Sequence, residues 1–468
     1  MYQEVALGTH LYIRKTELGH AKIRELRDEL TLIPRGSEGP GDPVYLYDER
    51  TEWFGIPLYH LTRPPTEWGR KVHDLRSEGK PAKFQFKSKL RPGQEPVIAA
   101  FETWLQAGAT GFLLEAKPGF GKTVTLLKMI QLIGRTALIV VPRSNLVQQW
   151  IDRAKEHTTL QQSEIGYVNG QDILWRGKKL VVGLVHSLAL DRLGDDFKKY
   201  FGVVAPDEVD HSIPPSTFAP VLSLFPAKYR IGASAEMKRF DGLEVIFHKH
   251  IGQVHLRGVA CDDETMMPKA VIVRYPADAG KVPGHLGAMQ RRGILLSKLA
   301  KSPARNMMLA RYIRMIYNSK RRVVVLSDRV QHLLILRELV EKMQGIPKRE
   351  TGMYVGSLPK GGPLGKHVKM SAQERKRVAS DCKVIFATYQ MFALGTDIQD
   401  LAGLIFATPQ SEIVQSKGRI ERALEGKKEP VLVDVVDSAY KDAERWAAKR
   451  MAHYRSEGMT IKRVNEGG

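Results

Sequence analysis

The chain has 468 residues, 43% of them hydrophobic, and it carries 72 Lys and Arg against 51 Asp and Glu, a formal net charge of 72 − 51 = +21. This length accommodates about three domains with their own cores, and the positive surplus favours a polyanionic partner, either nucleic acid or an acidic membrane surface. The two cysteines, Cys261 and Cys382, are too few for a disulfide framework or a zinc cluster.

The sequence has no apolar stretch near the roughly 20 residues that cross a bilayer. Its N-terminus, MYQEVALGTHLYIRK, lacks the basic and apolar regions of a secretory signal, and we therefore expect a cytoplasmic protein without a membrane partner. The charge is unevenly distributed: Lys298 to Lys383 contains 20 Lys and Arg against 6 Asp and Glu, whereas residues 1–90 contain 15 against 13. Most of the basic surface is therefore expected in the C-terminal half.

The first 80 or so residues predict a small domain of mixed structure. Short alternating runs predict strands at 5–7 and 11–13, followed by a helix with Ile23, Leu26 and Leu30 on one face. A further strand-like segment, VYLYDERTEWFGIPLYHL, is rich in aromatic residues. These aromatics are Tyr45, Tyr47, Trp53, Phe54 and Tyr59. Such side chains can stack on bases, but at alternating spacing they more often fill a small core.

After residue 99 the sequence alternates short β-branched runs with segments of helical length. One series reads FLLE, TALIVV, KLVVGLV, GVVA and YRIGAS, and a second, after about residue 305, reads RRVVVLS, GMYVG, KVIFAT, GLIFAT and PVLVDVV. This alternation is typical of parallel sheets with crossover helices. The sequence therefore predicts two successive α/β domains, with DAGKVPGHLG near residue 280 as a connector and GSLPKGGPLGK near residue 360 as a loop.

Residues 116–123 read AKPGFGKT, between an apolar run at 112–114 and a helix-like stretch at 124–133. This is the context of a phosphate-binding loop, in which glycines let backbone N–H groups surround a phosphate. Lys122 can reach the β- and γ-phosphate oxygens of a nucleoside triphosphate, and the Thr123 hydroxyl can bind Mg²⁺. Ala116 stands where the first glycine of such a loop usually lies. A glycine-rich turn that binds nothing is the alternative.

An acidic pair, Asp207 and Glu208, follows the apolar run 201–205. The pair lies 207 − 122 = 85 residues after the loop lysine, at the end of a predicted central strand. There Asp207 would hold Mg²⁺ through water and Glu208 would deprotonate the attacking water. The alternative, an acidic turn at a strand end, is less consistent with that position.

Gln415, Arg419 and Arg422 are spaced i, i+4 and i+7, which places them on one face of a helix. Arginine forks donate two hydrogen bonds to phosphoryl oxygens, so the face would suit a γ-phosphate. A solvated polar face is the alternative. Because Gln415 lies 415 − 122 = 293 residues beyond Lys122, the nucleotide would lie in a cleft between two domains, and hydrolysis would open and close the two lobes.

Eight segments in order resemble the motif series of superfamily 2 helicases, with phage recombination helicases of the UvsW type and XPB-like DNA helicases as the nearest kin. The segments are LRPGQ (90–94), AKPGFGKT (116–123), VPRSNLVQQW (141–150), PDEVD (206–210), GASAEMKRFDG (232–242), VVVLSDRVQHL (323–333), IFATYQMFALGTDI (385–398) and QSKGRIER (415–422). The resemblance implies an α/β fold of two tandem RecA-like domains with a small α+β N-terminal domain. The implied divisions are an accessory nucleic-acid-binding domain at 1–83, an ATP-binding lobe at 84–257, a connector at 258–304 and a second lobe at 305–468.

The resemblance also assigns roles to individual residues. ATP and Mg²⁺ are the implied cofactors. Catalysis would involve Lys122, Asp207, Glu208, Gln415, Arg419 and Arg422, with Thr123 and Asp207 holding the metal. Nucleotide binding would involve Arg91, Gln94 (as reader of the adenine), Pro118, Gly119, Phe120, Gly121, Lys122, Thr123, Val124, Gly395 and Asp397. Nucleic acid would contact Arg143, Asn145, Ser187, Arg239, Ser327, Arg329 and Thr388, and Ser234 with Glu236 would couple the two sites.

The chain departs from the family pattern at several positions. Glu236 places a carboxylate where a hydroxyl normally links the lobes, and Asp210 stands where UvsW-like proteins usually carry histidine. Gly93 replaces an aromatic residue, so adenine stacking would have to come from Phe84 or Phe86. Leu394 replaces a usual acidic residue, for which we have no interpretation.

The resemblance predicts a monomeric ATP-dependent helicase or translocase that acts on forked, branched or single-stranded DNA, in the host cytoplasm if the protein is phage-encoded. An RNA helicase, acting on RNA or an RNA–DNA hybrid, is one alternative. A second is a translocase that moves on duplex DNA without separating the strands. A third is a non-catalytic nucleic-acid-binding protein with a degenerate ATP site.

Overall fold

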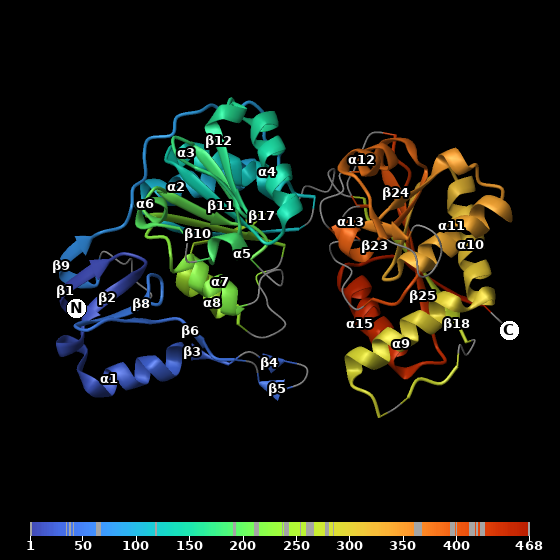
Figure 1. Cartoon of the computed structure of the whole chain (residues 1–468), viewed down its shortest axis with the longest axis horizontal. Coiled ribbons are helices and arrows are strands. Elements are labelled where there is room, and N and C mark those ends of the chain that lie inside the picture. Colours follow the sequence, from blue (N-terminus) through green and yellow to red (C-terminus); the bar gives the residue numbers. More distant parts are fainter. Residues whose placement is uncertain are drawn as a thin grey trace. The chain divides into compact units, whose positions relative to one another are not determined.

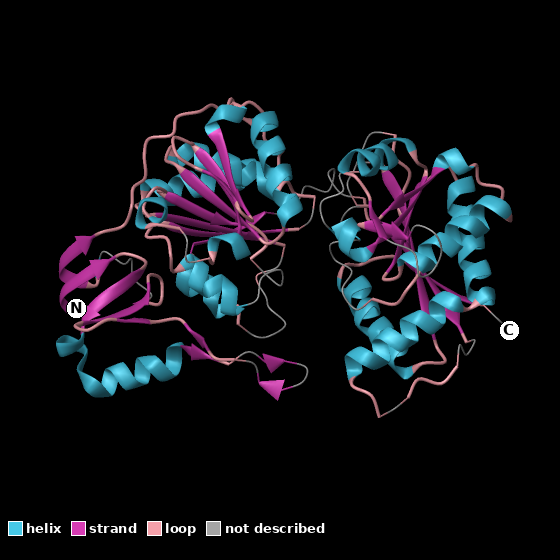
Figure 2. Cartoon of the chain, in the orientation of Figure 1, coloured by secondary structure: helices cyan, strands magenta, loops and turns pink. Residues whose placement is uncertain are grey.

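The computed structural model describes residues 2–33, 35–36, 39–40, 42–61, 67–117, 119–190, 193–209, 215–235, 237, 243–252, 254–258, 266–276, 280–283, 285–359, 367–393, 398, 400–410, 417, 420–421 and 426–466. The chain forms two compact units, Met1–Ala260 and Cys261–Gly468. Each is built on a sheet with helices on both faces (Figures 1 and 2).

The main sheet of the first unit has eight strands in the order β13-β12-β14-β11-β15-β16-β10-β17, and only β13 runs antiparallel to its neighbour. Its strands are β10 (Gly111–Ala116), β11 (Ala137–Val141), β12 (Ile165–Asn169), β13 (Asp172–Leu174), β14 (Leu180–Leu184), β15 (Val203–Pro206), β16 (Tyr229–Ser234) and β17 (Val254–Gly258). The helices are α2 (Glu95–Gln106), α3 (Lys122–Ile133), α4 (Ser144–His157), α5 (Val185–Leu188), α6 (Asp195–Lys198), α7 (Pro215–Leu222) and α8 (Val245–His250).

This sheet separates two hydrophobic cores, because successive residues of a strand point to opposite faces. Phe112 and Leu114 of β10 pack with α2, α3 and α4, whereas Leu113 between them belongs to the core that includes α5, α7 and α8. Strands buried on both sides need continuous apolar runs, and FLLE and ALIVV supply them.

The N-terminal sheet has five strands in the order β7-β8-β2-β1-β9. They are β1 (Tyr2–Leu7), β2 (His10–Arg14), β7 (Asp48–Glu49), β8 (Trp53–Pro57) and β9 (Gly69–Asp74), and α1 (Lys15–Leu30) follows β2. Two short ribbons pair β3 (Thr31–Leu32) with β6 (Val44–Tyr45) and β4 (Arg35–Gly36) with β5 (Gly39–Pro40). The predicted strands at 5–7 and 11–13 are confirmed, and Ile23, Leu26 and Leu30 are the buried residues of α1.

Most of the five aromatic residues singled out in the N-terminal domain are buried or pack against other side chains. Phe54 and Tyr59 are buried, and Tyr47 stacks on Phe54 with ring centroids 5.4 Å apart. Trp53 lies under the Arg14 guanidinium at 4.6 Å. Tyr45, which is 57% exposed, is the member of the set that solvent reaches most freely.

The N-terminal domain shares its hydrophobic core with the main sheet of the first unit. Arg230 of β16 fixes this junction although it is fully buried. Its guanidinium donates to the carbonyl oxygens of Thr9 (3.1 Å), Phe225 (3.1 Å) and His250 (2.7 Å). Because a buried charge is costly unless its donors are satisfied, these three bonds hold the two sheets in one arrangement.

The sheet of the second unit has seven parallel strands in the order β20-β23-β19-β24-β25-β18-β26. They are β18 (Lys269–Tyr275), β19 (Arg322–Ser327), β20 (Thr351–Tyr354), β23 (Val384–Thr388), β24 (Leu401–Phe406), β25 (Val431–Asp437) and β26 (Ile461–Asn465). The remaining elements are α9 (Ala288–Lys301), α10 (Pro303–Asn318), α11 (Val330–Lys342), α12 (Ala372–Asp381), α13 (Tyr389–Ala393), α15 (Lys441–Ser456) and the ribbon of β21 (Ser357–Pro359) with β22 (His367–Lys369).

Two buried ion pairs anchor helices to this second sheet. The Arg305 guanidinium of α10 binds both carboxylate oxygens of Asp437, at 2.6 and 3.0 Å. Arg450 of α15 binds both oxygens of Asp434 at 2.8 Å, and the Tyr454 hydroxyl also donates to Asp434. Satisfied bidentate pairs of this kind fix helix register, whereas removal of one partner would leave a buried charge.

The predicted α/β fold, with two parallel-dominated sheets and a small N-terminal domain, is confirmed. The segment 258–304, expected as a connector, instead contains β18 and α9 of the second unit. Its strand, KAVIVRY, lies between β25 and β26 and precedes residue 305, where the second strand series was expected to begin. Within the described ranges, no helix is long and apolar enough to span a membrane.

We predict that acid weakens the first unit through His10. Burial, aided by the nearby Arg230 charge, lowers the pKa of His10 to about 4, and its ring packs edge to face on His250 at 5.7 Å. The neutral ring is therefore favoured in the folded state. Stability should be retained above pH 6.5, the ordinary histidine pKa, and should fall as the pH drops toward 4, because only the unfolded chain takes up the proton there.

Chemical denaturation at pH 7.5 and 4.5 tests this expectation. His10→Phe should lose roughly 2–3 kcal/mol less unfolding free energy over this interval than the parent chain. An equal loss in both proteins would show that His10 does not carry the acid sensitivity.

Candidate nucleotide and nucleic-acid site

Three neighbouring strands of the first unit bring the predicted ATP-site residues to one edge of the sheet. Strand β10 leads into the phosphate-binding loop, β15 leads into Asp207, and β16, which lies between them, ends at Ser234. Glu115 of β10 is in register with Ser234, and Asp207 bridges to Ala233. The carboxyl ends of parallel strands are where such sheets bind ligands.

The loop between β10 and α3 has the backbone conformation that its glycines permit. Gly119 and Gly121 have φ values of 94° and 92°, which side-chain-bearing residues rarely adopt. Phe120 between them is 1% exposed and packs so closely on β17 that a Cβ at Gly258 would lie 2.6 Å from its ring. The buried phenyl ring therefore anchors the loop from below.

The LRPGQ segment braces the same loop. The Gln94 side-chain amide donates to the carbonyl oxygens of Phe120 (2.9 Å) and Gly121 (3.3 Å), and its oxygen accepts from the Arg91 N–H (3.0 Å). The Arg91 guanidinium donates to the Gly119 carbonyl at 2.8 Å. Gln94 is 2% exposed. In this structure its amide therefore supports the loop, and its predicted contact with adenine stays a prediction.

Lys122, Thr123 and Val124 form the first turn of α3. The N-cap residue is Gly121, so no side chain caps the helix, and the first turn has no acidic residue. Backbone N–H groups at the start of a helix and the positive end of its dipole suit a phosphate. The Lys122 ammonium donates to the Ala116 carbonyl at 2.8 Å, within reach of the loop that it would serve.

The acidic pair is held by a contact that the sequence did not reveal. The Trp150 indole N–H of α4 donates to Asp207 Oδ2 at 2.9 Å, and the Glu208 N–H donates to Asp207 Oδ1 at 3.0 Å. Glu208 itself has a φ of 54°, and the only other described residue besides glycine with positive φ is Lys320. Backbone strain of this kind clusters at functional sites.

These residues fit a nucleotide with Mg²⁺. Among the described residues, no group of three or more His, Cys, Asp or Glu forms a dedicated metal site. Mg²⁺ usually retains several waters and takes one or two protein ligands beside the phosphates. The hydroxyl of Thr123 and the carboxylate of Asp207 are donors of that kind.

Ser234, predicted to couple nucleotide and nucleic acid, is fully buried at the end of β16. Beside it, Glu115 forms an ion pair with Arg257 of β17 (3.4 Å), lies 3.1 Å from the His255 imidazole, and accepts from the Met237 N–H at 3.3 Å. Glu115 is not among the predicted site residues, and its only signal in the sequence is its position shortly before the loop. This carboxylate joins β10 to the segment that follows Ser234.

The predicted nucleic-acid residues of the first unit differ in exposure. Arg143 is half-buried at the N-cap of α4, and Asn145 follows in the first turn of that helix. Ser187 is 3% exposed, and its hydroxyl accepts from the Gly170 N–H at 2.8 Å. This bond stabilises the turn after β12. The roles of these residues in binding nucleic acid stay predictions.

In the second unit, Ser327 and Thr388 lie side by side at the ends of β19 and β23. Ser327 is buried and contacts His332 Nδ1 at 3.1 Å, and its hydroxyl accepts from the Arg329 N–H at 3.1 Å. Arg329 is exposed at the N-cap of α11. Its guanidinium donates to the Gly293 carbonyl of α9 at 3.1 Å.

Several predicted site residues lie outside the described residues. They are Pro118, Glu236, Arg239, Gly395, Asp397, Gln415, Arg419 and Arg422, as is the departure at Asp210. Within QSKGRIER, the described Lys417 is 1% exposed and forms ion pairs with Glu421 and Glu457. The roles assigned to Gln415 and the two arginines stay predictions.

The chain matches known proteins in sequence. Residues 87–239 match the family described as "Type III restriction enzyme, res subunit". A protein of Acanthamoeba polyphaga mimivirus, named as an ATP-dependent RNA helicase, is 24% identical over 96% of this chain and 85% of its own. A protein of Escherichia phage T5, named as a helicase, is 26% identical over 74% and 72%. The DNA 3'-5' translocase XPB2 of Sulfurisphaera tokodaii is 28% identical over 36% of each chain.

The fold also matches solved structures. The structure of Dbp5 from S. cerevisiae, bound to RNA and ADP with BeF3, superimposes on 80% of this chain and 94% of that chain with a TM-score of 0.52 and 14% sequence identity. At that identity the likeness concerns the fold alone. It confirms the tandem RecA-like architecture that the motif order predicted.

The ordered motifs, the family match and the relatives show that the chain is similar to superfamily 2 helicases, and they indicate an enzyme that hydrolyses ATP.

We predict that Trp150→Phe weakens both the fold and the catalytic edge. Loss of the indole N–H leaves the buried Asp207 Oδ2 without that donor, which should lower the unfolding free energy by about 2 kcal/mol. Freed rotation of the carboxylate should also lower ATPase turnover. Denaturant titration and steady-state ATPase assays measure the two effects. Trp104→Phe, at a position 50% exposed on α2, is the control and should change stability by less than about 0.5 kcal/mol.

Proposed function

We propose that the protein is an ATP-dependent DNA helicase or translocase that unwinds or branch-migrates forked or recombination-intermediate DNA. The observation that carries the proposal is the convergence of three features on one sheet edge. These are the braced loop at Gly119–Lys122, the Asp207 and Glu208 pair, and buried Ser234 between them. A hydrolytic site and the element that would transmit its state thus share neighbouring strands.

The positions of the residues at this sheet edge suggest a separate role for each of them in ATP hydrolysis. Trp150 and the Glu208 backbone fix the orientation of the Asp207 carboxylate. We assign the general base role to Glu208 because it is the carboxylate that follows Asp207 at the end of β15. Bound Mg²⁺, for which Thr123 and Asp207 are the candidate ligands, would neutralise charge on the transferred phosphoryl group. Gln415, Arg419 and Arg422 are the further residues that we propose to take part in hydrolysis.

Nucleic acid would be held mainly through its phosphates. The stretch from Lys298 to Lys383 has a charge of 20 − 6 = +14, and phosphate contacts are independent of sequence and weaken with salt. The N-terminal domain shares a core with the first lobe. In this proposal it moves together with that lobe and selects the junction.

DNA is the proposed substrate, and RNA is the alternative with specific support. The XPB2 relative is named as a DNA translocase, whereas the mimivirus relative is named as an RNA helicase. Forked DNA, a Holliday junction, single-stranded DNA, an RNA duplex and an RNA–DNA hybrid should be compared as ATPase stimulators and as strand-separation substrates. Greater activity on the RNA substrates would overturn the proposed substrate. ATPase stimulation by duplex DNA without strand separation would favour the translocase alternative.

Glu208→Gln tests the hydrolytic assignment. The amide cannot accept a proton from water, so turnover should fall by about 10²- to 10⁴-fold while nucleotide binding persists. Steady-state ATPase and a fluorescent ATP analogue measure the two properties. Glu156→Gln, an exposed change on α4, is the control and should retain parental turnover. Full activity of Glu208→Gln would show that another group activates the water.

A further inference from the structure

Helix α9 of the second unit presents a stripe of residues that the core does not use. Leu295, Leu296 and Leu299 are buried, whereas the opposite side carries residues at spacings of three and four. With Leu286 and Arg329 they line an open groove of about 630 Å³. The stripe residues are Gln290, Gly293, Ile294, Ser297, Lys298 and Lys301.

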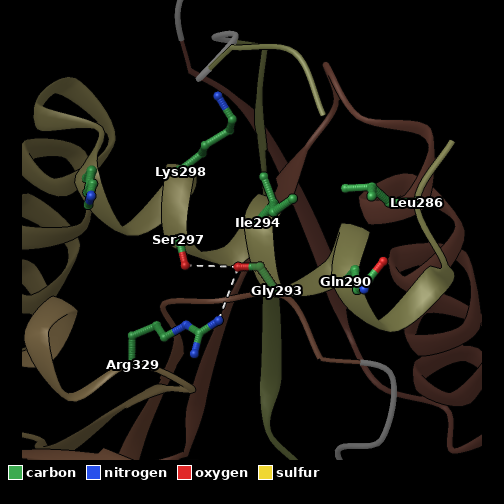
Figure 3. A pocket seen from close by; sticks show the side chains of 8 residues that line it. Leu286, Gln290, Gly293, Ile294, Ser297, Lys298 and Arg329 are labelled. Carbon is green, nitrogen blue, oxygen red and sulfur yellow. Dashed lines mark hydrogen bonds between the residues drawn. The ribbon is translucent and has the colours of Figure 1, made fainter. Parts of the chain in front are cut away.

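The centre of the groove lies at Gly293, and a hydrogen bond to this residue fixes the cationic side chain of Arg329. Gly293 has no side chain at the middle of the stripe, and its carbonyl accepts from Ser297 Oγ (2.9 Å) and the Arg329 guanidinium (3.1 Å). Figure 3 shows both side chains directed at that carbonyl. Ile294 and Leu286 add apolar surface beside them. Arg329 is therefore positioned before any ligand arrives, which reduces the entropy lost on binding.

The sequence around α9 is strongly basic. Between residues 279 and 327 the sequence contains eleven Lys and Arg and no Asp or Glu. Some of these cations are paired: Arg291 with Asp442 and Arg292 with Asp328. Lys298 and Lys301 form no ion pair with a carboxylate in the described part of the chain. Within the described ranges, these two lysines therefore add positive charge that no carboxylate neutralises.

The groove also adjoins the edge of the sheet where nucleic acid is proposed to run. Arg329 follows β19 directly, and Ser327 at the end of that strand is paired with Thr388 of β23. We propose that the α9 groove binds a nucleic-acid strand, with phosphates on Arg329, Lys298 and Lys301 and a base or sugar against Ile294 and Leu286. A groove of this volume has room for about one or two nucleotides.

The proposal rests on the proposed function and extends the track to a helix outside the recognised motifs. The groove combines apolar surface at Ile294 and Leu286 with cations at Lys298, Lys301 and Arg329. This combination suits a nucleotide better than a simple polyanion, because burial of a base or sugar against the apolar surface is favourable. Phosphates gain from the lysines through release of counterions.

The test compares Lys298→Ala/Lys301→Ala with Lys342→Ala/Lys462→Ala, which removes the same charge from exposed positions elsewhere in the unit. Fluorescence anisotropy with a labelled 20-nucleotide strand, from about 50 to 300 mM salt, gives Kd and its salt dependence. The groove variant should bind roughly tenfold more weakly, and its slope of log K against log salt should be smaller by about 1.4. The control pair should bind like the parent.

Lysine labelling of the parent protein, read by mass spectrometry, avoids the risk of misfolded variants. The strand should protect Lys298 and Lys301 but leave Lys342 and Lys462 reactive. Equal weakening in both variant pairs, absence of protection, or protection by anionic vesicles or an acidic peptide in place of the strand would overturn the α9 proposal. A parent protein that neither binds the strand nor shows stimulated ATPase would instead overturn the proposed function.

Discussion

The adjacency of β10, β16 and β15 is the constraint on which the candidate site depends. Parallel strands place the loop around Lys122, the Ser234 position and the Asp207 carboxylate at one edge, with residues in register across the three strands. No residue of this set is close to another in sequence. A change that shifted one strand by a residue would reverse its faces and separate the loop from the acidic pair.

Support of the site comes from buried side chains that are not themselves reactive. Phe120 fixes the loop through the core, Gln94 through two backbone carbonyls, and Trp150 fixes Asp207. Each of these contacts satisfies a polar group or fills space next to the edge, so the reactive positions hold their geometry without a ligand. Among the residues of this edge that the structure describes, Glu208 is the non-glycine residue with a positive φ, and its N–H donates to Asp207 Oδ1.

Sequence reasoning identified the strands and the chemistry because both leave local patterns. FLLE and ALIVV are apolar throughout, and AKPGFGKT fixes glycines and a lysine at set spacing. Partners that meet only in three dimensions leave no such pattern. The sequence around Trp150 does not indicate that its indole donates to Asp207. The sequence likewise does not predict that the buried Arg230 side chain donates to three backbone carbonyls. Strand β18 does have a local apolar pattern, KAVIVRY, but it precedes residue 305, where the second strand series was expected to begin.

The positive charge of the second unit has two distinct uses. Arg305 and Arg450 form buried ion pairs that fix helices to the sheet, so these two charges are not available to an external ligand. Lys298 and Lys301 lie on the outer side of α9, and Arg329 is held there by a neutral carbonyl. A net charge summed from sequence cannot separate these populations. In the described part of this unit, the unpaired, solvent-facing cations on α9 and at the strand edge are the ones available to a polyanion, which is the basis of the proposed binding groove.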